Sequence, residues 1–585
     1  MNPRIVIQTL LLFLVCLSPA AAQEGRIAGV ALSSGFSMGL PLGIPPGPTN
    51  DRMLAVAPED VAAYLSWSRV ARADPQSSNR TEQLIANPEV RYLLDHLATS
   101  FRQLITGSTR GDKGAEAIAE IGRKLVETLV THETAIYLRT VDGPTGGLVC
   151  DLGDEANDIK TLVAMIAKMG GDRVTTSTIE GLTVYSVAVD SVASVQLTVG
   201  NRYLILAVGD EELASILDRF KGNLTAAWLE QAHKRLAVDR PSSLSYINVD
   251  HLARSFGNGR ALPAELSAMG LDDIRSMTCV TGFDKDAIVI QTLFQIKEPL
   301  QERLQTIGGK LTTSDISSMS PDSTLMAAAK LDPNALMDAV FTVLEEIEEG
   351  LSEDVEREFA REFGMQMRRD IVDALGSTIQ LYESPREGGR LLTGWTAVID
   401  IRDRAKMLRL NSKLEQTFSD PDAPARIKKR QLGRDTVSYL TFSRRGPGFT
   451  PSWSISGNRL IVSAFPQNIY GLLNRSPMPP SKSIVARLQE RDSFLFIKIR
   501  EKDVAQLAYP LVELVAAQLP AEMPNDVAQW IEFDPGALPS LPAITDHLDN
   551  ATITCNVTDG LEIVRRQTLP PSGASLLAVI GMMSD

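Results

Sequence analysis

The segment VQLTVGNRYLILAV, residues 195–208, decides the fold, and WSISGNRLIVSAF, residues 453–465, repeats it. In each segment, two runs of β-forming residues flank a Gly-Asn pair. Because Gly and Asn both tolerate a positive φ, this pattern predicts a tight β-hairpin. A predicted helix follows each hairpin, with ILDR at 216–219 corresponding to LLNR at 472–475. The chain is therefore predicted to contain one structural unit twice.

Other segments recur in the same order along the chain. The matched pairs are 57–60 with 320–323, helices around 115–129 and 365–375, strands 135–138 and 378–381, strands 147–150 and 395–399, helices near 158–169 and 403–418, strands 245–249 and 495–499, and strands 277–282 and 553–560. The last pair contains Cys279 and Cys555 at equivalent positions. This order supports two related halves rather than two unrelated domains.

The strand segments alternate apolar and polar residues, as in 182–189 and 436–442. Alternation with tight turns indicates antiparallel sheet, and apolar stripes on the helices 115–129 and 335–347 indicate that helices cover it. The predicted fold class is thus α+β, with two tandem copies, each an antiparallel sheet covered by helices. We place the first copy at 53–298, a linker at 299–318, the second copy at 319–572 and a tail at 573–585.

The N-terminus has the pattern of an export signal. Arg4 precedes an apolar run at 5–17, and Ala20 and Ala22 form an A-x-A cleavage site. Cleavage near Ala22 is expected to leave a protein of the periplasm, the cell envelope or the extracellular space, with no membrane-spanning helix in its mature chain. Residues 23–52 are rich in Gly and Pro and are predicted to be a linker.

Composition excludes several classes of protein. The 585 residues are 44% hydrophobic and 22% charged, which is ordinary for globular domains. A net charge of −14 argues against a nucleic-acid binder. Cys150, Cys279 and Cys555 remain after cleavage, so at most one disulfide is possible, and we expect three buried thiols.

Motifs with known chemistry are weak. Gly35-Phe-Ser-Met-Gly39 matches a nucleophile elbow, but Pro45 and Pro46 follow where a helix is needed. The five His have no metal-ligand spacing, and His251 is a candidate acid–base residue that we interpret as a solvated or capping side chain. The acidic group at 151–158 could hold calcium but lacks the D-x-D-x-D-G pattern. No catalytic residue, cofactor or metal is predicted.

Two charged segments are interpreted as surfaces. The acidic run from Glu345 to Glu358, followed by arginines up to Arg369, has the spacing of a solvated helical face. The cluster of Arg426, Lys428, Lys429 and Arg430 is predicted to be a basic strand. It is either an edge strand protected by its charge or a contact surface for an anionic partner.

The chain also resembles a family of exported bacterial proteins of unknown function. The likeness lies in the Pro-Asp/Glu-Asp opening, the strand–helix–hairpin–helix order and the closing segment 544–553 with Gly560. It covers most of residues 53 to 570. The resemblance implies export and this architecture, and it supplies no catalytic residues.

The duplicated pattern has no duplicated polar constellation, which favours a non-enzymatic envelope protein acting as an interaction or scaffolding module. Its partner is an unidentified envelope protein or polymer, and its oligomeric state is open. The candidate interaction residues are Arg202 and Arg459, in the repeated turns, with the basic cluster Arg426, Lys428, Lys429 and Arg430. Two alternatives stay open: an exported hydrolase using carboxylates such as Asp151 or Asp250 between the copies, and a carrier of an apolar ligand.

Overall fold

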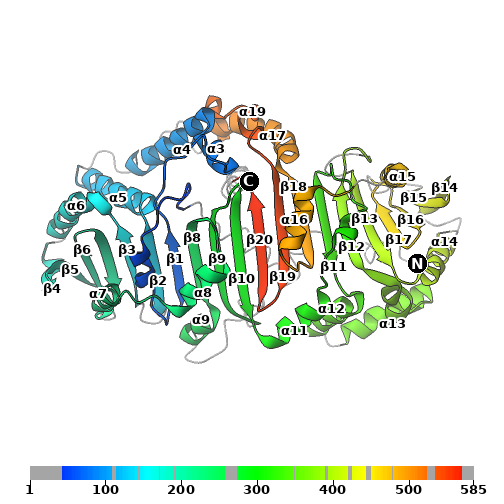
Figure 1. The fold of residues 1–585 in the computed structure, drawn as a ribbon, viewed down its shortest axis with the longest axis horizontal. Coiled ribbons are helices and arrows are strands. Elements are labelled where there is room, and N and C mark those ends of the chain that lie inside the picture. Colours follow the sequence, from blue (N-terminus) through cyan, green and yellow to red (C-terminus); the bar gives the residue numbers. More distant parts are fainter. Residues whose placement is uncertain are drawn as a thin grey trace. The chain divides into compact units, whose positions relative to one another are not determined.

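The computed structural model describes residues 42–107, 113–140, 145–169, 171–189, 193–256, 273–347, 350–388, 393–418, 425–442, 449–476, 479–522 and 534–569. The segment predicted to be an export signal, the elbow-like motif at 35–39 and the segment 573–585 predicted to be a tail lie outside these residues. The fold is mixed α+β with extensive antiparallel sheet (Figure 1). The chain divides into two compact units. Of the described residues, the N-terminal unit has those within 42–296, 505–549 and 564–569, and the C-terminal unit has those within 297–504 and 550–563.

The N-terminal unit is built on a sheet whose paired strands are all antiparallel. Their order across the sheet is β4 (Val174–Ile179), β5 (Leu182–Val189), β6 (Ala193–Val199), β7 (Tyr203–Val208), β3 (Thr145–Asp151), β2 (Thr134–Thr140), β1 (Ala63–Trp67), β8 (Arg240–Asn248), β9 (Ile274–Phe283) and β10 (Ile288–Ile296). The quoted segment 195–208 forms β6 and β7, as predicted.

The C-terminal unit pairs its strands in a corresponding order. The strands are β14 (Ala425–Leu432), β15 (Asp435–Phe442), β16 (Ser452–Ser456), β17 (Arg459–Ser463), β13 (Trp395–Ile401), β12 (Leu375–Glu383), β11 (Leu325–Lys330), β18 (Leu495–Arg500) and β19 (Asn550–Val557). Strand β14 thus corresponds to β4, β15 to β5, and so on for each strand of the two orders up to β19 and β9. The residues of α17 (Glu501–Glu522) and β20 (Leu561–Gln567) are divided between the units.

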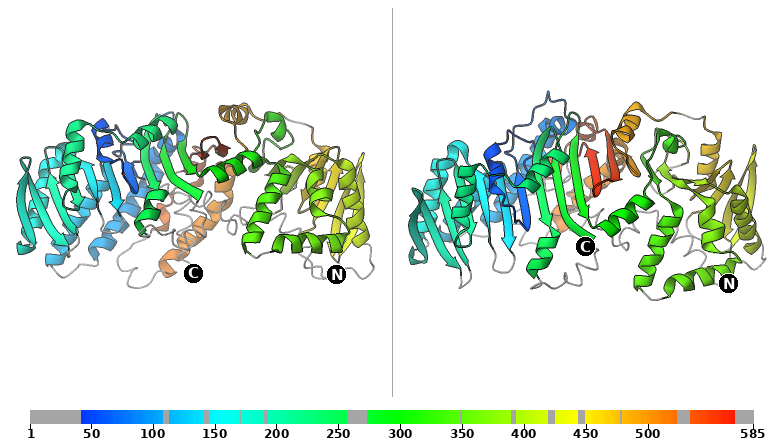
Figure 2. Two further views of the ribbon diagram at one scale, coloured as in Figure 1. Left: turned by 90° about the horizontal axis from the view of Figure 1, so that it is seen from below. Right: turned by 60° about the horizontal axis from the view of Figure 1, so that its bottom comes forward.

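Helices cover both faces of the N-terminal sheet (Figure 2). The helices of this unit are α3 (Arg80–Ala86), α4 (Pro88–Gly107), α5 (Lys113–Thr131), α6 (Ala156–Met169), α7 (Glu212–Gly222), α8 (Ala227–Arg235), α9 (Val249–Phe256) and α19 (Leu541–Thr545), with the short η2 (Asp51–Val56) and η3 (Gly153–Glu155). Successive strand residues face opposite sides: in β7, Ile205 joins the core under α7 and α8, while Leu204 joins the core under α5 and α6. This is the packing that the alternating pattern predicts.

The C-terminal sheet is covered in the same way. Its helices are α11 (Glu298–Ile307), α12 (Pro333–Ile347), α13 (Leu351–Phe363), α14 (Arg404–Thr417), α15 (Pro466–Asn474) and α16 (Lys482–Glu490), with the short turns η6 (Thr313–Ile316), η7 (Met367–Ile371) and η8 (Val372–Ala374). In β17, Ile461 joins the core under α15 and α16, whereas Leu460 packs with α14 on the opposite face. The helix expected at 365–375 is instead the π-helix η7 and the 3₁₀ turn η8, because Gly364, whose φ is +60°, caps α13 after Phe363 and interrupts the helix.

Two stretches predicted as linkers are parts of the units. Residues 299–318 contain α11 and η6, and Leu311 and Ile316 are buried in the C-terminal core. In the described part of 23–52, Pro45 and Pro46 are buried, and the backbone of this segment hydrogen-bonds to Arg69 and Ala71. Both stretches are therefore packed or hydrogen-bonded parts of the units, and their Gly and Pro content does not make them flexible linkers. The described residues within 505–549, expected in the second copy, belong to the N-terminal unit.

The three cysteines of the described residues are free and buried, as expected. Burial raises the pKa of Cys150 to about 11 and that of Cys555 to about 12. Cys279 of β9 lies opposite Ser245 of β8, and Cys555 of β19 lies opposite Leu495 of β18. These two registers align the same strand segments that the sequence comparison matched.

Candidate functional site

The basic cluster forms one strand at a sheet edge. Arg426, Lys428, Lys429 and Arg430 all lie in β14, and all four are exposed. Among the described residues, β14 pairs only with β15. Because side chains alternate along a strand, Arg426, Lys428 and Arg430 share one face and Lys429 lies on the other. The strand therefore presents positive charge on both faces of its free edge.

Two neighbouring helices position this charge. The guanidinium of Arg430 lies 4.8 Å from the ring centre of Tyr470 on α15, a cation–π contact. Lys429 Nζ lies 2.8 Å from Glu415 Oε1 of α14, on the opposite face. Arg430 and Lys429 are thus held by side chains of the unit. Lys428 has no ion-pair partner among the described residues.

The corresponding edge of the N-terminal unit is neutral. Strand β4 reads VTTSTI and pairs with β5, as β14 pairs with β15. Its four central residues, Thr175, Thr176, Ser177 and Thr178, are exposed. An edge strand in this fold therefore does not require positive charge, and the charge of β14 is a separate feature of its sequence.

Arg202 lies in the β6–β7 turn and binds the carboxylate of Asp151. Its Nε and Nη2 donate to Asp151 Oδ1 and Oδ2 at 2.6 and 2.7 Å. Asn50 Nδ2 donates to Asp151 Oδ2 at 2.8 Å and to the Tyr203 hydroxyl at 2.9 Å. Burial opposes ionisation of Asp151, but the hydrogen bonds from Arg202, Asn50 and Gly153 outweigh it and hold its pKa below the ordinary value. The structure thus brings together two residues that the sequence analysis named separately.

Glu133 lies beside this pair and has the opposite shift. Burial, reinforced by the charge of Asp151, raises the pKa of Glu133 to about 7. Its Oε2 accepts the backbone N–H of Asn50 at 2.8 Å. Asn50 therefore joins both carboxylates to the segment that enters the sheet, and the arrangement anchors that segment.

The second carboxylate named for a hydrolase is at the other end of the same sheet. Asp151 is the last residue of β3. The preceding Cys150 lies in register with Ser243 of β8 across the intervening strands β2 and β1. Asp250 is the second residue of α9, beyond the far end of β8. From Ser243 to the end of that strand is roughly 16 Å at a rise of about 3.3 Å per residue. Asp151 and Asp250 therefore cannot act on one substrate bond, and His251 lies with Asp250.

Arg459 does not occupy the position of Arg202. In the first hairpin the Gly200 N–H donates to the Tyr203 carbonyl, so the turn residues are Asn201 and Arg202, whereas the second turn is Gly457-Asn458. Only Gly457 of these residues has a positive φ, at +58°. Arg459 is therefore the first residue of β17, opposite Asp400 of β13. It is also three strands away from β14, so it does not extend the basic edge.

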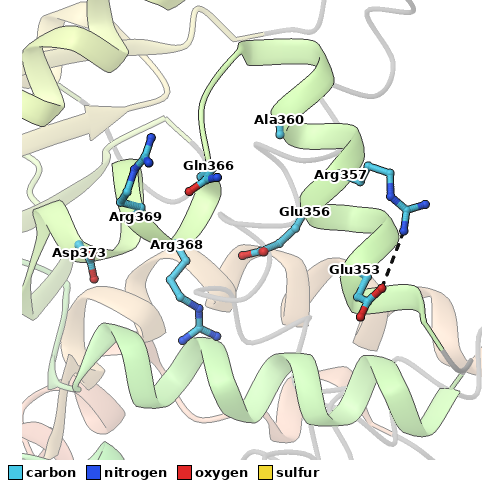
Figure 3. A pocket seen from close by; sticks show the side chains of 8 residues that line it. All are labelled: Glu353, Glu356, Arg357, Ala360, Gln366, Arg368, Arg369 and Asp373. Atoms are coloured by element: carbon cyan, nitrogen blue, oxygen red, sulfur yellow. Dashed lines mark ion pairs between the residues drawn. The ribbon is translucent and has the colours of Figure 1, made fainter.

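A pocket of about 530 Å³ lies in the C-terminal unit between α13 and η7 (Figure 3). Its lining residues are Glu353, Glu356, Arg357, Ala360, Gln366, Arg368, Arg369 and Asp373. Glu345 of α12 fixes the start of α13 by accepting the N–H groups of Gly350 and Ser352 at 2.8 and 3.1 Å. The sequence analysis treated this acidic segment as a solvated face. The ion pairs of Arg357 with Asp354 and Arg361 with Glu358 bear that out, but the pattern gave no signal for the pocket.

Within the described ranges, no group of three or more His, Cys, Asp or Glu side chains is arranged to hold a metal ion. None of the helices in those ranges combines the length and the apolar character needed to cross a membrane. The acidic group at 151–158 instead places Asp151 on Arg202 and Asp154 and Glu155 in η3.

The family model described as "Protein of unknown function (DUF3352)" matches residues 151–465, more than half of the chain, and the chain belongs to this family. No curated protein matches the chain. Solved structures similar to it include two crystal forms of TP0453. Form IV is 12% identical, covering 43% of this chain and 83% of that chain with a TM-score of 0.22. Form III is 11% identical, covering 44% and 88% with a TM-score of 0.22. These TM-scores support no conclusion on function.

Proposed function

We propose that this member of the DUF3352 family is an exported, non-enzymatic interaction protein of the cell envelope, and that strand β14 contacts an anionic partner. The observation that carries the proposal is the difference between two corresponding edge strands. β14 has four exposed cations, and β4 has none. Because β4 shows that the fold tolerates a neutral edge, the charge of β14 calls for an explanation beyond folding.

The units are, on this proposal, two tandem copies of one ancestral unit. The corresponding strand order and the matched registers of Cys279 and Cys555 support this origin. Duplication leaves one copy free to change its surface while the other keeps the fold. The N-terminal pattern ending near Ala22 supports export.

The partner that fits β14 best is an acidic protein segment in extended form. Carboxylates at every second residue of an added strand would share one face and would meet Arg426, Lys428 and Arg430, which share one face of β14. The edge of β14 that pairs with no described strand also offers backbone N–H and C=O groups, which a peptide can pair with and a polysaccharide cannot. An anionic polymer would use only the charges.

The test is binding of an extended acidic peptide, alternating Glu and Val, to the mature protein, measured by fluorescence anisotropy at several salt concentrations. Intact mass of that protein checks cleavage near Ala22. Changing Arg426, Lys428, Lys429 and Arg430 to Gln should weaken binding at least tenfold. The control carries the same change of four charges at Arg52, Lys160, Arg173 and Lys234, which are exposed in the N-terminal unit.

Equal weakening in both variants would overturn the proposal, because it would show that net charge rather than β14 attracts the peptide. Tighter binding of an anionic polysaccharide than of the peptide, lost in the β14 variant only, would assign the edge to a polymer instead. Binding by neither ligand would remove the proposed role of β14.

A further inference from the structure

The pocket between α13 and η7 is lined by charges that are almost all paired. Arg357 binds Asp354 at 2.8 Å, and Arg368 Nη2 lies 2.6 Å from Asp338 Oδ1 of α12. Arg369 contacts the neighbouring Asp370 at 3.3 Å. Glu353 and Asp373 have ion pairs with Arg357 and Lys406, at 3.9 and 3.8 Å. The remaining lining charge is the carboxylate of Glu356.

Glu356 is unusual because one of its oxygens is buried without a partner. Its Oε1 is shielded from solvent and makes no hydrogen bond to any residue that the structure describes. The side chain points from α13 into the space toward η7, while Arg357, the next residue, points away (Figure 3). The side chain as a whole is partly exposed, but a shielded oxygen without a hydrogen bond is unfavourable, so a donor that reached it would gain more than one that met a fully solvated carboxylate.

We propose that this pocket binds a small organic cation with one charged group, a primary ammonium or a guanidinium, which pairs with Glu356. A volume of about 530 Å³ is in the range of small-molecule sites. The carboxylate can turn toward the pocket because the terminal torsion of Glu is soft. The carboxamide of Gln366 and the methyl group of Ala360 offer the ligand one polar and one apolar contact.

The same geometry disfavours other cations. Ca²⁺ and Mg²⁺ need six or more oxygen ligands, and the guanidinium groups of Arg368 and Arg369 line the same pocket. These arginines would also repel a second positive charge on the ligand. The site therefore selects a monocation of modest size, and it is independent of β14 and of the function proposed for that strand.

The experiment compares n-butylguanidinium and n-butylammonium with 1,4-butanediammonium by isothermal titration calorimetry on the full mature chain. One of the two monocations should bind saturably at one site, at least tenfold more tightly than the dication. Glu356→Gln should weaken this binding at least tenfold. Glu358→Gln, on the same helix but exposed and paired with Arg361, should leave it unchanged.

A second measurement on the ligand-free protein keeps the proposal open to refutation. Glu356→Gln removes the buried charge while keeping the shape, so its melting temperature should be equal to or higher than that of the wild type. A lower melting temperature would show that the carboxylate is already paired in solution and would overturn the proposal. Absence of binding by both monocations, or equal binding by Glu356→Gln, would overturn it as well.

Discussion

Each unit buries a cluster of one Tyr, one Glu and one Arg side chain against its sheet, but the Glu comes from a different element in each unit. In the N-terminal unit, the Tyr137 hydroxyl of β2 donates to Glu212 Oε1 at 2.5 Å. Arg219, at the end of α7, lies 3.6 Å from the same oxygen and donates to the Tyr137 hydroxyl at 2.8 Å. Tyr137 and Glu212 are buried, and Glu212 begins α7.

In the C-terminal unit, the Tyr382 hydroxyl of β12 donates to Glu387 Oε2 at 2.7 Å. Arg475, directly after α15, forms an ion pair with Glu387 and donates to the carbonyl of Ser318. Here the glutamate follows β12 instead of beginning the helix. The two Tyr–Glu–Arg clusters therefore have the same chemistry and different chain connections.

This comparison separates what the fold demands from what one unit has acquired. A largely buried guanidinium needs an anion, and either carboxylate meets that need. The clusters link a helix to the sheet in both units, which is a structural role that recurs. By contrast, β4 has no cations where β14 has four. Of the two features compared, only the cations of β14 therefore support a proposal on function.

The largest effect should come from removing Arg475. Glu387 is 3% exposed, so Arg475→Met leaves a buried charge without its partner and should lower the free energy of unfolding by about 3–5 kcal/mol. Arg219→Met should cost less, because Arg139 Nη1 remains 3.0 Å from Glu212 Oε2. Urea unfolding of both variants measures the difference.

The double variant Arg475→Met, Glu387→Gln is the control, since neutralising the glutamate should recover at least half of the loss. If Arg219→Met cost as much as Arg475→Met, the two clusters would be equivalent and Arg139 would have no supporting role.

A medium effect is expected from the pH dependence of Glu133. Below about pH 4.5 it is protonated in both states and has no effect on stability. Between 4.5 and its folded pKa of about 7 the unfolded state ionises first, so stability falls as pH rises and then levels off. Glu133→Gln should therefore match the wild type at pH 4.5 and exceed it by up to about 3 kcal/mol at pH 8.

Thermal unfolding across this pH range tests the expectation, with Glu155→Gln, a partly exposed carboxylate of the same unit, as the control. A gain that is independent of pH would show that burial of Glu133 does not hold its proton.

The smallest effect should come from the two arginines of the repeated sequence. Arg202→Gln loses an ion pair to Asp151 but is 55% exposed, so its cost should be under about 1 kcal/mol. Arg459→Gln should cost less, because no ion pair of Arg459 is present among the described residues. Neither should change binding of the acidic peptide to β14. A loss of peptide binding in Arg459→Gln would extend the contact surface to β17.

Much of this architecture could be predicted from the sequence because it is encoded locally. The buried face is indicated by the period-two alternation in 182–189 and 436–442 and by the apolar stripe of 115–129. The elements α5, β5 and β15 form where these patterns predict them. The basic strand could be predicted for the same reason. The partners of Asp151, the Tyr–Glu–Arg clusters and the pocket could not, because they join residues far apart in the sequence.

The sequence by itself determined most of the order of strands and helices, the two-fold recurrence of the hairpin pattern, the burial of the cysteines and the charge of β14. Only the tertiary structure decided the register of each hairpin, which places Arg202 in a turn and the matching Arg459 in a strand. It also decided that the segment 299–318 buries Leu311 and Ile316 in the core and that Glu356 Oε1 makes no hydrogen bond to a described residue. Periodicity reports the environment of a residue, whereas the identity of its neighbour depends on which strands pair and in what register.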